Sequence, residues 1–368
     1  MTVAVLLAAA ATRVFFLLNA PVAISAPVDV TVERGESPRS IAERLSSVGV
    51  VRSSTALVFL ARSSGKDRDI RYGTHRFEGP LTPSEVLDEL GRNPEPTLRV
   101  TIAEGSTLAD AAEEMERQGV VTASAYHEAA CDPELLATLP IDKGANCAEG
   151  YLFPDTYDLA PWMTPADVVR TQVKHFYEVM DELLAAAATV PANAIVPVSA
   201  TETPWQNDAQ ARASVVAKTV ILASIVEKEA KLPEERGLIS SVFHNRLARG
   251  IPLQADPTVI YGLDTAGTPW DRAMLHRHLR EPSPYNTYTQ KGLPSGPICN
   301  PGRESLRAAL QPPATSYIYF VARGDGAHRF STTLADHNRA VAELRRQVAA
   351  AAAARAAAPL DGQVGASN

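Results

Sequence analysis

The amino terminus is the most apolar part of the chain. Residues 3–11 are apolar without a break, and residues 14–18 continue the apolar run after Thr12 and Arg13. A helix of about 20 apolar residues spans a bilayer. Three interpretations follow: a single-pass anchor over residues 1–27 with Arg13 reaching toward the membrane surface, an export signal cleaved near residues 23–26, or a buried core helix. We favour the anchor, and the first two interpretations both place the rest of the chain outside the cytoplasm.

An internal repeat follows at an offset of 70 residues. Residues 30–35 (VTVERG) match residues 100–105 (VTIAEG), and a Gly-Val-Val triplet recurs farther along both copies. In each copy an alternating strand ends at a glycine turn, a polar residue (Ser37 or Thr107) opens an amphipathic helix, and a glycine ends that helix before a second one. The pattern predicts two β-α-α units that pack on neighbouring structure.

The rest of the pattern is mainly helical. Residues 217–231 lack Gly and Pro and indicate a mostly buried helix, which Pro233 separates from a second helix. Residues 317–321 indicate an apolar strand that leads through a Gly-Asp-Gly turn into a hairpin. We therefore expect the α+β class, with a mostly helical carboxy-terminal domain over residues 161–348 that includes this small β element. The Ala-rich residues 349–368 are expected to be a disordered tail.

Composition limits the classes of protein. The 368 residues are 45% hydrophobic and 21% charged, which is typical of a globular protein of two or three domains. Lys plus Arg number 35 against 42 for Asp plus Glu, a formal charge of −7, which excludes a broadly basic nucleic-acid binder. Three Cys exclude a disulfide-framework protein and a four-thiolate zinc site.

The cysteines and histidines give no metal-ligand spacing, so we expect neither a metal nor a cofactor. Cys131 and Cys147 lie in the same segment and would form a disulfide in an oxidising compartment, with two free core thiols as the alternative. Cys299 is left over in a loop rich in Pro and Gly. His276 and His278 are two residues apart and would point to opposite faces of a strand.

Two carboxylates end the buried helix. Glu229 continues its thickest apolar stripe, whereas Glu227 continues a thinner one and can pair with Lys231 at i+4. Desolvation would raise the pKa of Glu229 and keep it protonated near neutral pH, as a general acid at a glycosidic oxygen requires. Spacing alone, however, favours the simpler interpretation of two solvated residues at a helix end.

Two later loops are typical of a carbohydrate groove. Gln254 and Asp256 lie at an Asp-Pro-Thr turn or helix start, where side chains can face a cleft. Tyr285, Asn286 and Tyr288 lie on a loop stiffened by proline. Aromatic faces stack on sugar rings, and amides bind hydroxyl and acetamido groups. The alternative is a packing loop rich in Pro and Tyr.

Eight short segments occur in an order that points to one known family. They are residues 149–157, 223–229, 242–247, 253–262, 285–288, 292–298, 319–321 and 337–338. With these segments the chain resembles the endolytic murein (lytic) transglycosylases of the MltG/YceG-like family, over roughly residues 28–345. One segment alone is a weak signal, but their number and order make the resemblance specific.

The resemblance implies an architecture and a location. It implies a single-pass protein of the cell inner membrane, with the bulk of the chain on the periplasmic (extracytoplasmic) side. A LysM-like domain over residues 28–95 and the second β-α-α unit over residues 96–160 would precede the catalytic domain. Association with cell-wall synthases, in addition to peptidoglycan glycan strands, is a further expectation from the family.

The resemblance also implies a reaction. The family cleaves the bond between N-acetylmuramic acid and N-acetylglucosamine inside nascent strands without water, leaves 1,6-anhydro-muramic ends, and so terminates strand elongation. The family's catalytic residue corresponds to Glu229, in agreement with the helix-face argument, and Glu227 is the fallback. The implied general acid then acts as the base, so one carboxyl suffices where ordinary glycosidases use two.

Two other functions remain open at this point. A non-catalytic scaffold could bind peptidoglycan through the repeats and recruit synthases through the carboxy-terminal domain. Such a scaffold would lose nothing when Glu229 becomes Gln. A lysozyme-like hydrolase could use the same groove, and it would leave reducing muramic ends in place of anhydro ends.

Overall fold

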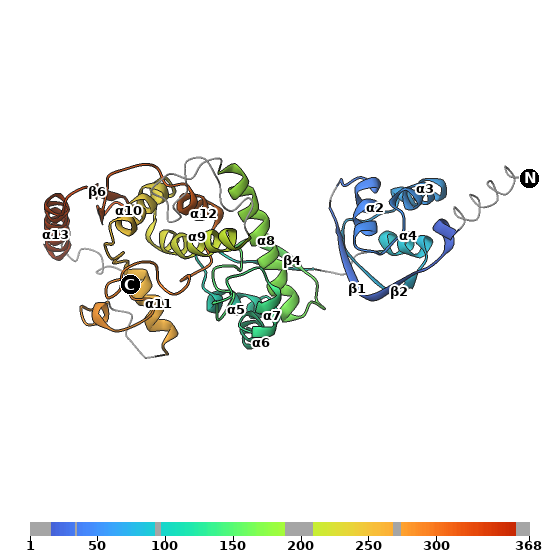
Figure 1. The fold of residues 1–368 in the computed structure, drawn as a ribbon, viewed down its shortest axis with the longest axis horizontal. Coiled ribbons are helices and arrows are strands. Elements are labelled where there is room, and N and C mark those ends of the chain that lie inside the picture. The colour runs from blue at the N-terminus through green and yellow to red at the C-terminus, as the bar shows by residue number, and fades with distance from the viewer. Residues whose placement is uncertain (1–15, 34, 93–96, 188–208, 268–273, 358–368) are drawn as a thin grey trace, which may run out of the picture. The chain divides into compact units, whose positions relative to one another are not determined.

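The computed structural model describes residues 16–33, 35–92, 97–187, 209–267 and 274–357, with the side chains of the last seven left out (Figure 1). The chain divides into two compact units. Unit 1 comprises residues 1–98 and 158–162, and unit 2 comprises residues 99–157 and 163–368. Each unit is described by itself.

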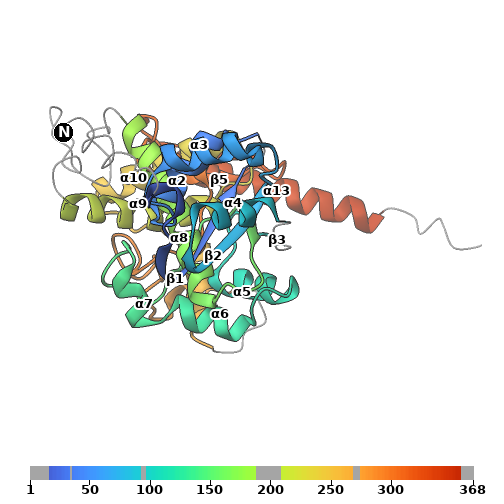
Figure 2. The same ribbon diagram turned by 90° about the vertical axis from the view of Figure 1, so that its right-hand side faces the viewer.

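Unit 1 is a two-stranded antiparallel ribbon with helices packed on it (Figure 2). Its elements are β1 (Val22–Val32), α2 (Pro38–Ser47), α3 (Ser54–Ser64), η1 (Lys66–Arg68), β2 (Gly73–Leu81) and α4 (Pro83–Gly91). Val30, Leu45, Phe77 and Leu90 are buried together in its core. Because β2 and α4 complete this core, the first β-α-α copy does not form a domain without them.

Nearly all of the second β-α-α copy belongs to unit 2; Leu98 at its start, and Asp158 and Leu159 of the strand that pairs with it, are assigned to unit 1. The elements of this part are β3 (Leu98–Thr101), α5 (Leu108–Arg117), α6 (Ala123–Ala130), α7 (Pro133–Thr138), β4 (Thr156–Leu159) and α8 (Pro165–Ala186). Strand β3 pairs with β4, and α6 packs on both α5 and α8. The copy thus buries its apolar face against a neighbouring long helix.

A buried helix organises the rest of unit 2. The elements are α9 (Ala209–Glu229), η3 (Pro233–Glu235), α10 (Arg236–Ala248), α11 (Asp256–Thr265), η4 (His278–Arg280), α12 (Arg303–Leu310), β5 (Tyr319–Ala322), β6 (His328–Ser331) and α13 (Leu334–Ala357). Helix α9 contacts α10, α11 and α12, and runs among them in Figure 1. Its residues Val220, Leu222, Ile225 and Val226 are fully buried. This arrangement holds the end of α9 rigidly.

The α+β class, the helix pattern of both repeat copies and the β5–β6 hairpin are confirmed. Ser37 accepts a hydrogen bond from Ser40 N at the start of α2, and Thr107 forms a capping box with Asp110 at the start of α5. Glycines with positive φ follow both helices. The LysM-like character of the first copy and the expected domain names stay predictions.

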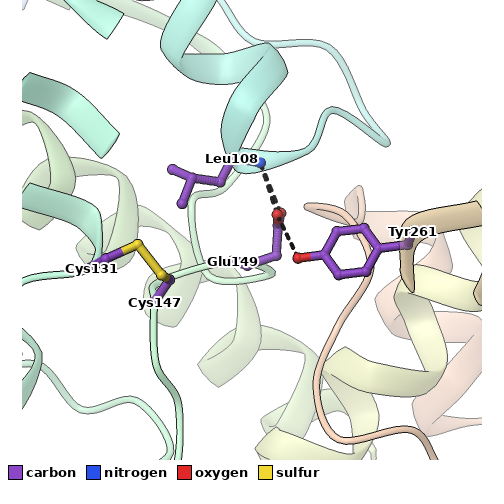
Figure 3. Close-up of a disulfide and its surroundings, with 5 residues drawn as sticks. All are labelled: Leu108, Cys131, Cys147, Glu149 and Tyr261. Atoms are coloured by element: carbon purple, nitrogen blue, oxygen red, sulfur yellow. Dashed lines mark hydrogen bonds between the residues drawn. A yellow bond between two sulfur atoms is a disulfide. The ribbon is translucent and has the colours of Figure 1, made fainter. Parts of the chain in front are cut away.

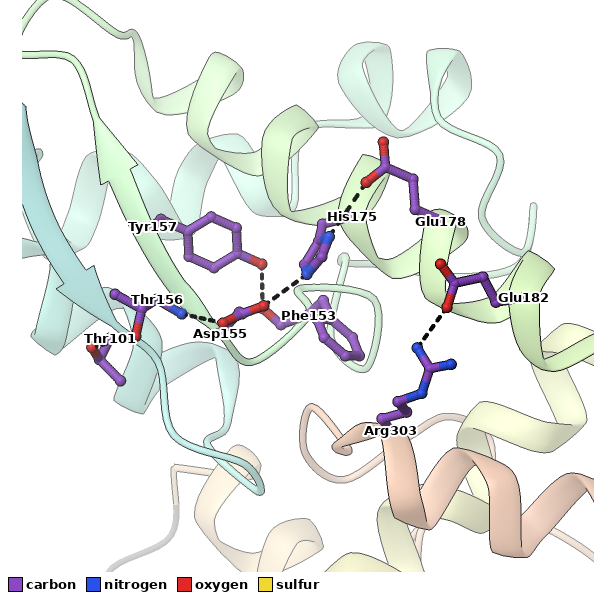
Figure 4. Close-up of polar contacts among 9 residues, drawn as sticks. All are labelled: Thr101, Phe153, Asp155, Thr156, Tyr157, His175, Glu178, Glu182 and Arg303. Carbon is purple, nitrogen blue, oxygen red and sulfur yellow. Dashed lines mark hydrogen bonds and ion pairs between the residues drawn. The ribbon is translucent and has the colours of Figure 1, made fainter. Parts of the chain in front are cut away.

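The disulfide between Cys131 and Cys147 is present, and Cys299 is a free, buried thiol. The bridge joins the end of α6 to the segment that leads into residues 149–157. That segment is also fixed against α8, where His175 Nε2 lies 2.8 Å from Asp155 Oδ2 and the His175 ring packs edge-on against Phe153 (Figure 4).

The two chain ends differ from expectation in detail. Residues 1–15 of the expected anchor lie outside the described residues, whereas its last residues form part of β1, which begins at Val22. Among the described helices, α9 has the length and apolar composition of a membrane span, but half of that window is buried inside the protein, as in a core helix. At the other end, α13 continues to Ala357, past residue 348 where we expected order to end.

Candidate active site

Glu227 and Glu229 have different surroundings because residues two apart on a helix point about 200° apart. The Glu227 side chain is only 7% exposed. Its carboxylate accepts a hydrogen bond from Gly302 N (3.0 Å) and pairs with Arg236 (3.2 Å). Arg236 takes the place of the Lys231 partner that the sequence suggested. Glu227 is therefore occupied in joining α9 to α10 and to the start of α12.

Glu229, the last residue of α9, is partly exposed. Within the described residues its carboxyl group has no hydrogen-bond partner. The pKa of Glu229 is raised to about 7, chiefly by burial and in addition by the negative charge of Asp256, while the Arg246 cation opposes both effects. At neutral pH a large fraction of the molecules therefore carries a proton on Glu229, and that proton is not held by a neighbouring acceptor.

Asp256 and Tyr288 lie together beside Glu229. Asp256 is the exposed first residue of α11, and the Tyr288 hydroxyl donates a 2.5 Å hydrogen bond to Asp256 Oδ1. Both residues interact electrostatically with Glu229. The loop that carries Tyr288 and the helix that begins at Asp256 thus meet at the end of α9.

Arg246, on α10, fixes the turn before Asp256. It is largely buried and donates hydrogen bonds to Ile318 O (2.7 Å), Leu253 O (2.8 Å) and Gln254 Oε1 (3.4 Å). Gln254 has φ 52°, a left-handed conformation that is costly for a residue with a side chain. Its backbone N–H donates to Thr287 O (3.1 Å). These bonds hold Gln254 in its strained conformation at the edge of the site.

A stack of rings continues from Arg246. Its guanidinium lies 5.4 Å from the centre of the Tyr319 ring, which stacks on His337 at 5.1 Å. Burial and the Arg246 charge lower the pKa of His337. Strand β5 and helix α13 therefore support the site through Arg246, a role that the sequence pattern did not reveal although residues 242–247 had drawn attention as a motif.

The other two expected groove residues lie elsewhere. Asn286 is 1% exposed, donates to Glu281 O (2.8 Å) and accepts from Tyr288 N (2.9 Å), so its amide shapes the loop. The Tyr285 ring packs against Tyr261 at 4.8 Å, and within the described part of the chain Tyr285 makes no hydrogen bond or ring contact with Glu229 or Asp256. The structure thus groups Glu229, Gln254, Asp256 and Tyr288, and separates Tyr285 and Asn286 from them.

No set of three or more His, Cys, Asp or Glu side chains in the described part of the chain is arranged to hold a metal ion. The chemistry available at the end of α9 is that of carboxyl groups, a guanidinium and phenols. A carboxyl with a pKa of about 7 can transfer a proton to an oxygen, and a second acidic side chain nearby can stabilise a developing positive charge.

Comparisons with known proteins point to one family. The profile of the YceG-like family matches residues 30–343. The endolytic murein transglycosylase of Bacillus subtilis is 30% identical over 329 residues, which cover 85% of this chain and 83% of that protein. The protein of the same name from Streptococcus pneumoniae (strain D39) is 28% identical, over 86% of this chain and 58% of its own, longer chain.

A solved structure agrees with this assignment. The crystal structure of a yceG-like protein from Listeria monocytogenes is 26% identical and has a TM-score of 0.52, and the match covers 85% of this chain and 99% of that one. The matched region includes both units and all of the residues at the end of α9. The chain belongs to the YceG-like family.

Proposed function

We propose that this protein is an endolytic peptidoglycan lytic transglycosylase in which Glu229 is the general acid and then the base. The observation that supports the proposal most directly is the carboxyl of Glu229, with a pKa of about 7, partly exposed and without a hydrogen-bond partner among the described residues. The names of the relatives supply the substrate class, since murein is peptidoglycan.

The first step requires a protonated acid. Glu229 would donate its proton to the glycosidic oxygen between N-acetylmuramic acid and N-acetylglucosamine, and the bond from that oxygen to muramic C1 would break. The substrate's own acetamido group and the Asp256 carboxylate would stabilise the positive charge that develops at C1. Tyr288 keeps Asp256 in place and hydrogen-bonded.

The second step returns the proton. The Glu229 carboxylate would remove the proton from the C6 hydroxyl as O6 forms a bond to C1, which yields the 1,6-anhydro end and restores the acid. No water is consumed, and no second carboxylate is required as a nucleophile. Arg246, which lowers the pKa of Glu229, would stabilise the carboxylate between the two steps.

The substrate-binding residues follow from their positions. Asp256 and Tyr288 interact electrostatically with Glu229. Gln254 is hydrogen-bonded to Arg246, which also interacts with Glu229. Gln254, Asp256 and Tyr288 would contact the sugars at the scissile bond. Asn286 would act as a positioning residue for the loop, because its side chain is buried in it. Tyr285 would contact sugars farther along the strand.

We also propose an extracytoplasmic location, with an amino-terminal anchor in the cell inner membrane. The disulfide supports this location, because such bonds persist in oxidising compartments. A LysM-like unit 1, contact with cell-wall synthases, and termination of nascent strands complete the proposal. These features are expected from the family and are tested separately from the reaction.

The experiment is a digestion of purified, uncrosslinked glycan strands by the full-length protein and by its Glu229→Gln variant. Glu234→Gln is the matched control, since Glu234 is an exposed carboxylate on η3 a few residues away. Products are identified by mass spectrometry. We expect 1,6-anhydro ends from the wild type and from Glu234→Gln, and none from Glu229→Gln.

Each other outcome has a defined meaning. Ends heavier by one water would identify a hydrolase, in which Asp256 activates the water. Cleavage that survives in Glu229→Gln and disappears in Glu227→Gln would transfer the acid role to Glu227. No cleavage by the folded wild type would favour the non-catalytic scaffold.

A further inference from the structure

A cleft lies in unit 2 beside α9, lined by Ala217, Ile221 and Lys228, which lie on a different face of the helix from Glu229. It has a volume of about 870 Å³, in the range of sites that hold small organic ligands. Its walls come from the start of α5, from α9 and α11, and from residues 142–147 and 295–297. We call it the disulfide-walled cleft, because Cys147 is part of its wall.

Glu149 is part of the cleft wall. Leu108 N donates to both of its carboxylate oxygens (3.0 and 2.9 Å), and the Tyr261 hydroxyl donates to Oε2 (3.2 Å) (Figure 3). Asn300 Nδ2 donates to Oε1 at 3.3 Å. Burial raises the pKa of Glu149 to about 7. Because donors surround its oxygens, Glu149 joins α5 to α11 and to the loop before α12.

The disulfide holds one wall of the cleft to α6. Cys131 ends α6, Cys147 belongs to the wall, and the adjacent Ala148 N donates to Ala130 O (2.8 Å). Figure 3 shows the bridge and the Glu149–Tyr261 hydrogen bond on either side of the same segment. The cleft is therefore fixed by covalent and hydrogen bonds before any ligand binds, as a preformed binding site requires.

The cleft and the active site share two helices. Lys228, which lines the cleft, precedes Glu229 on α9. On α11, Asp256 lies beside Glu229 and Asp264 lines the cleft, about 12 Å farther along at 1.5 Å per residue. This spacing is comparable to the length of a disaccharide, so an extended strand bound at Glu229 can reach the cleft along α11.

The lining has the chemistry of a sugar site. Tyr261 and Tyr285, both half-buried, pack edge to face at 4.8 Å and line the cleft together with Ile221. Lys228 and Ser295 add polar groups. Aromatic and aliphatic surfaces accept the apolar faces of pyranose rings, while the polar side chains bind hydroxyl and acetamido groups.

We propose that the disulfide-walled cleft binds N-acetylhexosamine units of the glycan strand at a distance from the bond that is cut. This inference rests on the proposed function and deepens it, because binding the strand on one side of the cut favours cleavage inside a long chain over cleavage of short fragments. The cleft takes part in binding only, and no bond is made or broken there.

The test blocks the cleft without touching Glu229. Ala109 is exposed on α5 and lines the cleft, so Ala109→Trp would fill part of it. Ala185→Trp is the matched control, since Ala185 is an exposed alanine on α8 and does not line the cleft. Both changes are made in the full-length Glu229→Gln protein, and titration calorimetry measures the binding of N-acetylglucosamine oligomers of increasing length.

We expect affinity to rise with oligomer length in the parent and in the Ala185→Trp control. In the Ala109→Trp variant the long oligomers should bind at least about tenfold more weakly, with little change for the shortest ones. With Glu229 restored, Ala109→Trp should raise KM for long strands more than it lowers kcat.

Equal binding of long oligomers by the two tryptophan variants would overturn the proposal. This result is distinguishable from a failure of the proposed function. If the wild type produces anhydro ends and Ala109→Trp binds long oligomers with unaltered affinity, only the binding role of the cleft is rejected. If binding depends on oligomer length but the wild type cleaves no strands, the proposed reaction is rejected and the binding role of the cleft is retained.

Discussion

Glu229 and Glu149 are two carboxyl groups with the same pKa, about 7, raised in both cases chiefly by burial, and they lie in contrasting surroundings. Glu149 is 8% exposed and receives hydrogen bonds from a backbone amide and from a tyrosine. Glu229 is more open, has charged neighbours in Asp256 and Arg246, and lacks a hydrogen-bond partner in the described part of the chain. A raised pKa alone therefore does not identify a catalytic acid, and the accessibility of the carboxyl is the feature that separates the two candidates.

The largest expected effect separates the two groups by activity. Glu229→Gln should lower the rate of strand cleavage by at least about 10²–10⁴-fold, because the general acid is lost, while the melting temperature stays near that of the wild type. Glu149→Gln should retain cleavage in its folded fraction. The test measures the rate at which anhydro ends are released, with melting curves on the same samples. Comparable losses of rate in both variants would contradict the different roles assigned to Glu229 and Glu149.

The next largest effect is expected for the Cys131–Cys147 disulfide, which lies close in sequence to Glu149. Removing the disulfide with Cys131→Ser and Cys147→Ser should lower the free energy of unfolding by about 2–4 kcal/mol, since the bridge closes a loop with a sequence separation of 16. Denaturant titration measures this loss. Cys299→Ser is the comparison, because Cys299 is a free thiol outside the bridge.

The same double variant sharpens the comparison between the two sites. Because Cys147 belongs to the wall of the disulfide-walled cleft and not to the residues grouped with Glu229, long oligomers should bind more weakly, whereas kcat should change less than KM. A fall in kcat with unchanged KM would contradict the assignment of the wall to binding.

A smaller effect is expected for the stability that Glu149 contributes. Its pKa is about 7 in the folded protein against an ordinary value of 4.5, so the folded state binds more protons between these values. The contribution of Glu149 protonation to the free energy of unfolding is complete below pH 4.5 and is lost as the pH rises toward 7. Glu149→Gln should abolish this pH-dependent loss of stability. At low pH the variant should also have a free energy of unfolding lower by about 1–3 kcal/mol, because an amide NH₂ replaces one of the oxygens that accept hydrogen bonds.

That measurement is made in the Glu229→Gln background, because Glu229 has a raised pKa and contributes in the same direction. Denaturant titrations at several pH values then report mainly on Glu149. A dependence on pH that is the same with and without Glu149 would show that its carboxyl is not the group that titrates.

Local signals in the sequence predicted much of the fold. Ser37 and Thr107 are N-caps as expected, and the Cys131–Cys147 pair forms. Caps and glycine turns act within one helical turn, so their patterns are readable without the tertiary structure. By contrast, the pairing of β1 with β2 joins strands far apart in sequence, and no local pattern had indicated β2 or α4.

The candidate site also combines features that local sequence predicts with features that depend on tertiary contacts. The face of α9 identified Glu229 as a candidate, and the structure gives it the raised pKa that the argument required. The helix pattern could not show that Glu227 meets Arg236, that Arg246 supports the Gln254 turn, or that Glu149 is buried. These facts depend on which distant side chains pack together, and composition and periodicity contain little information about that.

The smallest expected effect is a shift in the pH dependence of cleavage when Asp256, the charged neighbour of Glu229, is replaced. Asp256 raises the pKa of Glu229 through its negative charge, so Asp256→Asn should lower that pKa. The amide oxygen can still accept the Tyr288 hydroxyl, which preserves the local structure. Because the acid must be protonated to act, the limb of the pH–rate profile that falls with rising pH should move to lower pH, on the order of one unit.

The profile of kcat/KM against pH reports this change, with Glu234→Gln as the control for removing one carboxylate charge at the surface. An unmoved limb would show that Asp256 does not set the protonation of Glu229. A limb that moves in Glu149→Gln instead would mean that the proton used in cleavage comes from the buried carboxyl, and the contrast between the two groups would be reversed.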